Sequence, residues 1–211
     1  MGMLAHPIFS EEGDYPSLVR EIVYNISSKQ GFSRSLLPYF TDEEVKALRG
    51  SADFFSLNHY TTQLMSISAT EPDSKFVPAL FPKIGIEIGP DPSWHMSGPG
   101  WLYDYPPGFR KLLNWLQNNY KILKTIPIIV TENGLCDFGE EGTEDYQRVS
   151  YYNDYLHQVL LAIHEDGVNV KGYFAWSLMD DFEWTDGYTT KFGLFSVDFD
   201  SPNRTRTPKL S

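Results

Sequence analysis

The stretch PIIVTENG, residues 127–134, decides the fold of this chain, because a short β-branched strand ends there in a carboxylate, an amide and a glycine. In a (β/α)8 barrel the active site lies at the carboxyl ends of the strands, which makes Glu132 a candidate catalytic residue. The alternative is a strand that stops in an Asn-Gly turn with an exposed glutamate, since this dipeptide is common in turns. The stretch alone does not separate these two interpretations.

Predicted helices and strands alternate on both sides of this stretch. Four segments are predicted to be helices: residues 16–30, 41–50, 109–116 and 149–163. In three of them apolar residues recur at helical spacing, and the segment 41–50 opens with a capping box formed by Thr41 and Glu44. Apolar runs predict strands at residues 53–60, 127–132, 172–178 and 194–199. This order predicts right-handed βαβ units around a parallel sheet, and therefore an α/β fold.

A long segment between the first strand and its helix shows no sustained period. Residues 61–107 hold eight of the chain's fourteen prolines. Structureless stretches of this length are usually functional or disordered. Ring-bearing side chains in the second half of the segment argue for order: Trp94, His95, Trp101, Tyr103 and Tyr105. A loop that follows a barrel strand lies over the mouth of the active site, where we expect this segment.

Length and charge limit the possible functions. The chain has 211 residues, whereas a whole (β/α)8 barrel usually needs about 250 or more. A net charge of −11 argues against a nucleic-acid partner, which requires clustered Lys and Arg. No apolar run approaches the roughly 20 residues that cross a bilayer, so we expect no membrane partner. Cys136 is the only cysteine, which excludes an internal disulfide. Glycosylation sequons at Asn25 and Asn203 are compatible with a secreted parent protein.

Three predicted strand ends carry polar and aromatic residues: Asn58-His59-Tyr60, Glu132-Asn133, and the run from Trp176 to Trp184. In a closed barrel these ends converge on one face and place a carboxylate among hydrogen-bond donors and flat rings. Sugars match that combination. Their C–H faces stack on aromatic rings, and cleavage of a glycosidic bond needs a carboxylate at the anomeric carbon.

These motifs, with further blocks in the same order, resemble the β-glucosidases of glycoside hydrolase family 1. The blocks are His6-Pro7, Gly13-Asp14-Tyr15-Pro16, Asp53-Phe54-Phe55 through Asn58-His59-Tyr60-Thr61, Thr131-Glu132-Asn133-Gly134, Trp176-Ser177-Leu178, Phe182-Glu183-Trp184, Gly187-Tyr188, Phe192-Gly193-Leu194 and Thr207-Pro208-Lys209. The resemblance covers nearly the whole chain. It implies the C-terminal half of a (β/α)8 TIM barrel, incomplete as given.

The resemblance implies a role for each matching site residue. Glu132 matches the nucleophile, which forms a covalent glycosyl-enzyme. Tyr60 matches a tyrosine whose hydroxyl bonds that carboxylate and helps to hold it ionised, and Asn58 lies in the same pocket.

The remaining matches concern the sugar itself. Glu183 matches the residue that grips two hydroxyls of the glycone, with Trp184 beside it and Trp176 as the floor beneath the sugar. Phe192 lines the same pocket, and Trp101 matches an aromatic wall for the leaving group.

The chain departs from the family pattern in three places. Asp181 stands where Asn is frequent, and Lys191 where Arg is frequent. The Asn-Glu-Pro motif that carries the family's general acid/base does not occur. We therefore expect residues 1–211 to be a fragment, the C-terminal half of a single glycosidase barrel domain, inactive alone.

The predicted function is that of a retaining β-glycosidase fragment. The intact protein would hydrolyse O-glycosyl bonds of a small-molecule β-glycoside by double displacement, without a cofactor or metal. A cation site is the alternative for the oxygen-rich run that holds Asp180, Asp181, Glu183 and Asp186. A myrosinase-type thioglucosidase and a noncatalytic klotho-like binding relative remain alternative functions. The sequence predicts neither the oligomeric state nor the compartment.

Overall fold

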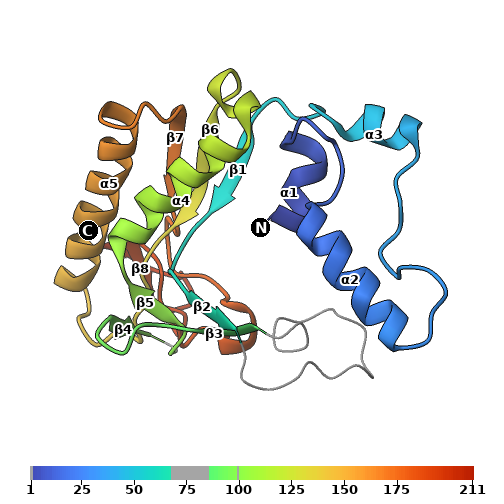
Figure 1. The fold of residues 1–211 in the computed structure, drawn as a ribbon. Helices are drawn as coiled ribbons and strands as arrows, with labels where there is room; N and C mark the ends of the chain where they lie inside the picture. Colours follow the sequence, from blue (N-terminus) through green and yellow to red (C-terminus); the bar gives the residue numbers. More distant parts are fainter. Residues whose placement is uncertain (1, 68–85, 99) are drawn as a thin grey trace. The chain divides into compact units, whose positions relative to one another are not determined.

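Strand β6 (Ile128–Asn133), which contains Glu132, is the central strand of a three-stranded sheet ordered β1-β6-β7 (Figure 1). Its neighbours β1 (Phe55–Asn58) and β7 (Val170–Ala175) both run parallel to it. Ile128 and Val130 are fully buried. β-Branched side chains pack well on a pleated surface that is covered by helices, which is why this short run forms a central strand.

The computed structural model describes residues 2–67, 86–98 and 100–211, and these fall into two units. The first unit comprises residues 1–53, 63–91 and 118–125, and the second comprises residues 54–62, 92–117 and 126–211. All the strands of the parallel sheet belong to the second unit.

Two long helices cover the parallel sheet. Helix α4 (Pro106–Asn119) precedes β6, and α5 (Tyr146–His164) connects β6 to β7, as the predicted βαβ order requires (Figure 1). The helices bury one face each, through Phe109, Leu113, Leu116, Tyr151, Tyr155 and Val159. The sequence therefore predicts both helices correctly, because their apolar residues recur with a period that matches the helix.

The described part of the segment 61–107 contains regular structure that its sequence does not predict. It contains two antiparallel hairpins, β2 (Leu64–Ile67) with β3 (Ile86–Gly89) and β4 (His95–Ser97) with β5 (Leu102–Asp104). The sequence predicts no strand in this segment, and residues 68–85 and 99 lie outside the described residues. Strands this short show no detectable period. Trp94 stacks on Tyr105 with ring centroids 4.4 Å apart, which accords with the order expected from the aromatic residues.

The first unit contains the helices α1 (Gly2–Phe9), α2 (Ser17–Lys29) and α3 (Asp42–Leu48), and the 3-10 helix η2 (Lys121–Lys124). Helices α2 and α3 are the two that the sequence predicts. The capping box is present, since Glu44 N donates to Thr41 Oγ1 at 3.2 Å and Thr41 N donates to Glu44 Oε2 at 2.8 Å. Helix α1 contains Pro7 and is not predicted.

The two sequons lie in different surroundings. Asn25 lies within α2, and Ser27 of the same sequon is fully buried, with its hydroxyl donating to Val23 O at 2.6 Å. Asn203 is exposed in the turn between β8 (Phe195–Val197) and β9 (Arg206–Pro208). Both acceptor asparagines, Asn25 and Asn203, are exposed in the folded structure.

Several strand boundaries differ from those the sequence predicts. The predicted strand over residues 53–60 is β1, which spans only Phe55–Asn58, and the predicted strand over 172–178 is β7, which ends at Ala175. Residues beyond these ends leave the sheet and form the loops at its carboxyl edge. The described residues form one three-stranded and three two-stranded sheets and no closed barrel. Of the helices in the described ranges, none is both long and apolar enough to cross a membrane.

Candidate active site

The three predicted strand ends meet at the carboxyl edge of the parallel sheet. Asn58 of β1 pairs in register with Glu132 of β6, and His59 N donates to Glu132 O at 2.9 Å. On the other side, Trp176 N donates to Asn133 O at 2.8 Å. Backbone hydrogen bonds therefore hold the segments that carry the candidate residues against one another.

The carboxylate of Glu132 accepts a hydrogen bond from the Tyr60 hydroxyl, with Oη 2.6 Å from Oε2. The pKa of Tyr60 lies far above its ordinary range. Burial raises it most, followed by the hydrogen bond to Glu132 and the charges of Glu132 and Glu183. Tyr60 therefore keeps its proton and remains a donor. Its ring contacts two other candidates edge-on, Trp101 at 6.0 Å and Phe192 at 5.6 Å between centroids.

Asn133 fixes the position of this strand end. Its side chain is fully buried, and its Nδ2 donates to His59 O at 2.7 Å and to Tyr151 Oη at 2.8 Å. Its Oδ1 accepts from Tyr173 Oη at 2.6 Å. One amide thus links the residue after β1 to α5 and β7. The sequence places Asn133 beside Glu132 but does not reveal this positioning role.

Glu183 and Trp176 form a second group at the same edge. Trp176 Nε1 donates to Glu183 Oε1 at 3.3 Å, and Glu183 is only 8% exposed. Burial, together with the neighbouring carboxyl group of Asp181, raises the pKa of Glu183 to about 7. The pair thus supplies an aromatic surface next to a carboxyl group, as a sugar site requires.

The other sequence-predicted residues differ in their surroundings. Phe192 is buried and contacts Tyr60, whereas Trp101 is 43% exposed beside the same ring. Asn58 is exposed, and its Oδ1 accepts from Thr131 Oγ1 at 2.5 Å. Trp184 is 84% exposed, so most of its ring faces solvent.

A buried ion network lies behind the site. Arg148 of α5 is fully buried and forms ion pairs with Asp137 and Asp145. Its Nε donates to Leu135 O at 3.1 Å and its Nη2 to Lys191 O at 3.0 Å. Arg148 therefore ties the loop after Glu132 to the segment that begins at Phe192. Sequence reasoning misses this residue, because only the spacing of Asp145 and Arg148 on one helix hints at a contact.

The sequence model of "Glycosyl hydrolase family 1" matches residues 1–211, the whole chain. The chain belongs to glycosyl hydrolase family 1. It is 40% identical to the cytosolic beta-glucosidase of Homo sapiens over 212 residues, which are 100% of this chain and 43% of that protein. It is 38% identical to Myrosinase 1 of Brevicoryne brassicae over 211 residues, with the same coverage of 100% and 43%.

Solved family 1 structures are similar over the same span. The structure of an aphid myrosinase has a TM-score of 0.84 and 38% identity, covering 99% of this chain and 43% of that one. The structure of beta-glucosidase 2 from Trichoderma reesei in complex with Tris has a TM-score of 0.83 and 35% identity, covering 100% and 43%. The chain thus spans less than half the length of these relatives. The predicted fold class, an α/β fold that covers part of a family 1 TIM barrel, is confirmed.

Protein groups bind the carboxylate of Asp180, one of the four residues of the alternative cation site. Asp180 Oδ1 accepts from Gly193 N at 2.9 Å and pairs with Lys209 Nζ at 3.3 Å, while its Oδ2 accepts from Val197 N at 3.3 Å. Both oxygens are thereby occupied. Within residues 2–67, 86–98 and 100–211, no three His, Cys, Asp or Glu side chains are grouped so that they could hold a metal ion.

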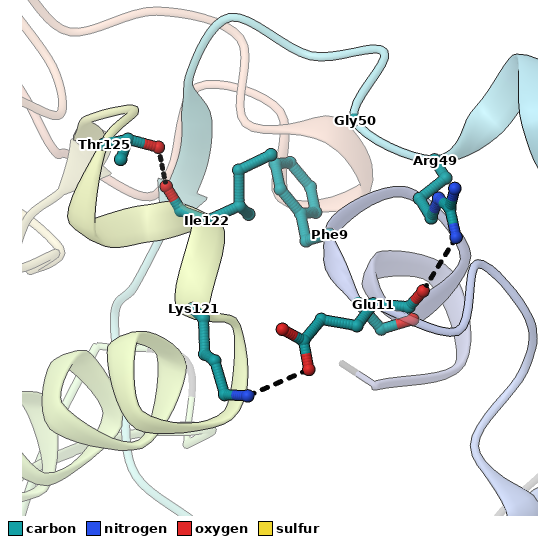
Figure 2. Close-up of a pocket in the computed structure, with 8 residues that line it drawn as sticks. Phe9, Glu11, Arg49, Gly50, Lys121, Ile122 and Thr125 are labelled. Atoms are coloured by element: carbon teal, nitrogen blue, oxygen red, sulfur yellow. Dashed lines mark hydrogen bonds and ion pairs between the residues drawn. The ribbon is translucent and has the colours of Figure 1, made fainter.

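Residues of the first unit line a pocket of their own. Its volume is about 550 Å³, and its lining includes Phe9, Glu11, Arg49, Lys121, Ile122 and Thr125 (Figure 2). Glu11 pairs with Lys121 Nζ at 2.9 Å, and its backbone oxygen accepts from Arg49 Nη1 at 3.1 Å. The side chains of Glu11 and Lys121 are each 70% exposed. Water-exposed ion pairs of this kind offer no activated group, so the pocket is not a candidate active site.

Proposed function

We propose that the protein containing this chain is a retaining β-glycosidase that hydrolyses O-linked β-glucosides, with Glu132 as its nucleophile. The observation that carries the proposal is the 2.6 Å hydrogen bond from Tyr60 to Glu132 at the carboxyl end of β6. A tyrosine that cannot lose its proton stabilises a negative carboxylate and orients it. The names of the relatives, beta-glucosidases and a myrosinase, support the same reaction class.

The proposed reaction has two displacements. We assign attack on the anomeric carbon to Glu132 Oε1, the oxygen that does not accept the Tyr60 bond. The bond from that carbon to the leaving oxygen breaks, and the leaving oxygen takes a proton from an acid/base residue outside residues 1–211. Water then attacks the same carbon, returns a proton to the acid/base and releases Glu132. In the intact protein the two carboxyl groups are then about 5 to 5.5 Å apart, as in other retaining enzymes.

The glycone is assigned to the second group of residues. Glu183 would accept hydrogen bonds from two sugar hydroxyls, with the ring of Trp176 beneath the sugar. Phe192, Trp184 and Asn58 would complete this subsite, and Trp101 would face the leaving group. The buried carboxyl of Glu183 and its 3.3 Å contact with Trp176 Nε1 support this assignment.

We also propose that residues 1–211 form the C-terminal half of a single barrel domain. Strands β1 and β7 each have only one neighbour within the described parallel sheet. Open edges of this kind require covering by further strands in a stable barrel. On this proposal the chain alone is inactive, because protonation of the leaving group, typically worth about 100- to 10,000-fold, is missing.

Exchange of Glu132 for glutamine in the full-length protein tests the nucleophile. Glutamine keeps the shape of the side chain but cannot attack the anomeric carbon. We expect turnover of an aryl β-glucoside to be lost in Glu132→Gln, while Glu43→Gln, at an exposed position of α3, retains it. Activity of Glu132→Gln within about tenfold of wild type, near 1.4 kcal/mol of transition-state stabilisation, would exclude this role.

A myrosinase-type activity on S-glycosides is the second candidate. The structural similarity to the aphid myrosinase, with a TM-score of 0.84, supports activity on S-glycosides. The similarity to the beta-glucosidase structures supports activity on O-glycosides to the same degree. The two differ in the leaving group, because a thiolate leaves without protonation more readily than an alkoxide. The ratio of specificity constants for matched O- and S-glucosides decides between them.

A further inference from the structure

We propose that Tyr151 of α5 is a positioning residue for the reaction, because its hydroxyl holds Tyr60 against the carboxylate of Glu132. The inference rests on the proposed function, in which Glu132 is the nucleophile. It goes beyond that function in assigning an effect on the reaction rate to a tyrosine of the helical core, which acts through Tyr60 rather than on the sugar.

The hydroxyl of Tyr151 connects two residues beside the Tyr60–Glu132 hydrogen bond. It donates to Tyr60 O at 3.0 Å and accepts from Asn133 Nδ2 at 2.8 Å. Asn133 directly follows Glu132 in β6. A phenolic hydroxyl has one proton, so accepting from the Asn133 amide leaves that proton for the Tyr60 carbonyl. One oxygen atom thus fixes the backbone next to both partners of the 2.6 Å bond from Tyr60 Oη to Glu132 Oε2.

Tyr60 needs this support because it lies beyond the end of the sheet. The pairing of β1 with β6 ends at Asn58 and Glu132, and a backbone bond from His59 N to Glu132 O at 2.9 Å follows it. Tyr60 is the next residue along the chain, past this ladder. Its position therefore depends on side-chain contacts, and Tyr151 supplies a contact to its carbonyl oxygen.

Packing within α5 holds Tyr151 itself in place. Tyr151 is 1% exposed, its ring stacks on that of Tyr155 with centroids 4.0 Å apart, and Tyr152 meets it edge-on at 5.9 Å. Burial raises the pKa of Tyr151 well above its ordinary value, so the hydroxyl keeps the proton that it donates. Tyr173 Oη donates to Asn133 Oδ1 at 2.6 Å, which orients the Asn133 amide toward Tyr151. The four groups form a directed chain of hydrogen bonds that ends at Tyr60.

A small displacement of a reacting group has a large effect on the rate, since a misplacement of about 1 Å can cost about 100-fold. Without the Tyr151 hydroxyl, Tyr60 O and Asn133 Nδ2 each lose a partner, and Tyr60 can move away from Glu132. Phenylalanine retains the stacked ring, so Tyr151→Phe removes the hydroxyl alone.

A double-mutant cycle in the full-length protein separates positioning from general destabilisation. We expect Tyr151→Phe to lower kcat/KM for an aryl β-glucoside by about tenfold. In a Tyr60→Phe background, where the bond to Glu132 no longer exists, the same change should cost less than about threefold. Tyr155→Phe is the matched control. It removes an equally buried hydroxyl of α5, which accepts from Tyr105 N at 3.2 Å, and should leave kcat/KM nearly unchanged.

Equal losses for Tyr151→Phe in the two backgrounds would overturn the proposal, and so would the absence of a loss when Tyr60 is present. If Tyr151→Phe does not fold, Tyr173→Phe takes its place in the cycle with the same expectation. That variant releases the Asn133 amide that the Tyr151 hydroxyl binds, while leaving the core of α5 intact.

Crystal structures of the full-length wild type and of the variant used in the cycle supply a readout that does not depend on hydrolysis. The distance from Tyr60 Oη to Glu132 Oε2, 2.6 Å here, should lengthen beyond about 3.0 Å, the upper limit for O–H···O hydrogen bonds. If wild type hydrolyses no β-glycoside but the distance lengthens in the variant, the proposed function fails and the positioning of Tyr60 by Tyr151 stands. An unchanged distance removes that positioning role even if hydrolysis is normal.

Discussion

Replacement of Arg148 by methionine should lower the free energy of unfolding by about 3–5 kcal/mol, the range found when one partner of a buried ion pair is removed. Methionine nearly fills the space of the arginine stem but cannot pair with Asp137 or Asp145. The exposed fractions are 0% for the side chains of Arg148 and Asp145 and 14% for that of Asp137. Two carboxylates would therefore lose their cation where water has little or no access.

The estimate stays well below the sum of the lost contacts. Arg148 makes four hydrogen bonds, and a bond to a charged group contributes about 1.5–3 kcal/mol. The sum of four such contributions exceeds the predicted loss of stability, because the contributions are not additive. The two carboxylates also keep other donors. Asp145 accepts from Ser211 N at 3.0 Å and Ser211 Oγ at 2.7 Å, and Asp137 accepts from Gly139 N at 2.5 Å.

The effect should depend on pH. Burial alone would raise the pKa of Asp145, but hydrogen bonds from Ser211 and Arg148 and the charge of Arg148 lower it overall below its ordinary value of 3.8. A lowered pKa in the folded state contributes stability above pH 3.8 that disappears as pH falls through the folded value. The difference between wild type and Arg148→Met should therefore be fully present at pH 7 and shrink below pH 4.

Urea unfolding of the full-length protein measures the change, and Arg110→Met is the matched control. Arg110 makes a bidentate pair with Asp166 at 2.6 and 2.7 Å on the surface, where solvent screens the interaction. The control should shift the unfolding midpoint much less than Arg148→Met. Adding Asp145→Asn to Arg148→Met should recover part of the loss. A loss under about 1 kcal/mol for Arg148→Met at pH 7 would refute the reasoning.

Two further substitutions test the site and its backbone. Tyr60→Phe removes the hydrogen bond to the proposed nucleophile and should lower kcat/KM for an aryl β-glucoside by about 10- to 150-fold, equivalent to about 1.5–3 kcal/mol; a loss under about threefold would show that the bond does not assist the reaction. In Gly134→Ala the added methyl group would overlap the backbone oxygen of Trp176, directly after β7. The free energy of unfolding, measured by urea titration, should fall by about 3 kcal/mol. Gly89→Ala, where a methyl group meets nothing within 4 Å, should be nearly neutral, and equal effects of the two would contradict the overlap.

The sequence alone determines the elements that local chemistry specifies. The capping box at Thr41 starts α3, and the helical spacing of apolar residues fixes α2, α4 and α5. The β-branched run before Glu132 predicts a short strand, and its central place in the sheet comes from the structure. The same reasoning places three polar strand ends at one edge, because parallel strands joined by right-handed crossovers end on the same side of the sheet.

Only the tertiary structure decides what depends on contacts between distant residues. Strands β2 to β5 are three or four residues long, so their pairing rather than their period defines them. Asn133 bridges residues 74, 18 and 40 positions away along the chain, and Arg148 ties Leu135 to Lys191. The exposure of Trp184 and the raised pKa of Glu183 likewise depend on how the chain packs. A linear pattern encodes which side chains exist and how they repeat, whereas distance, burial and charge proximity exist only after the chain has folded.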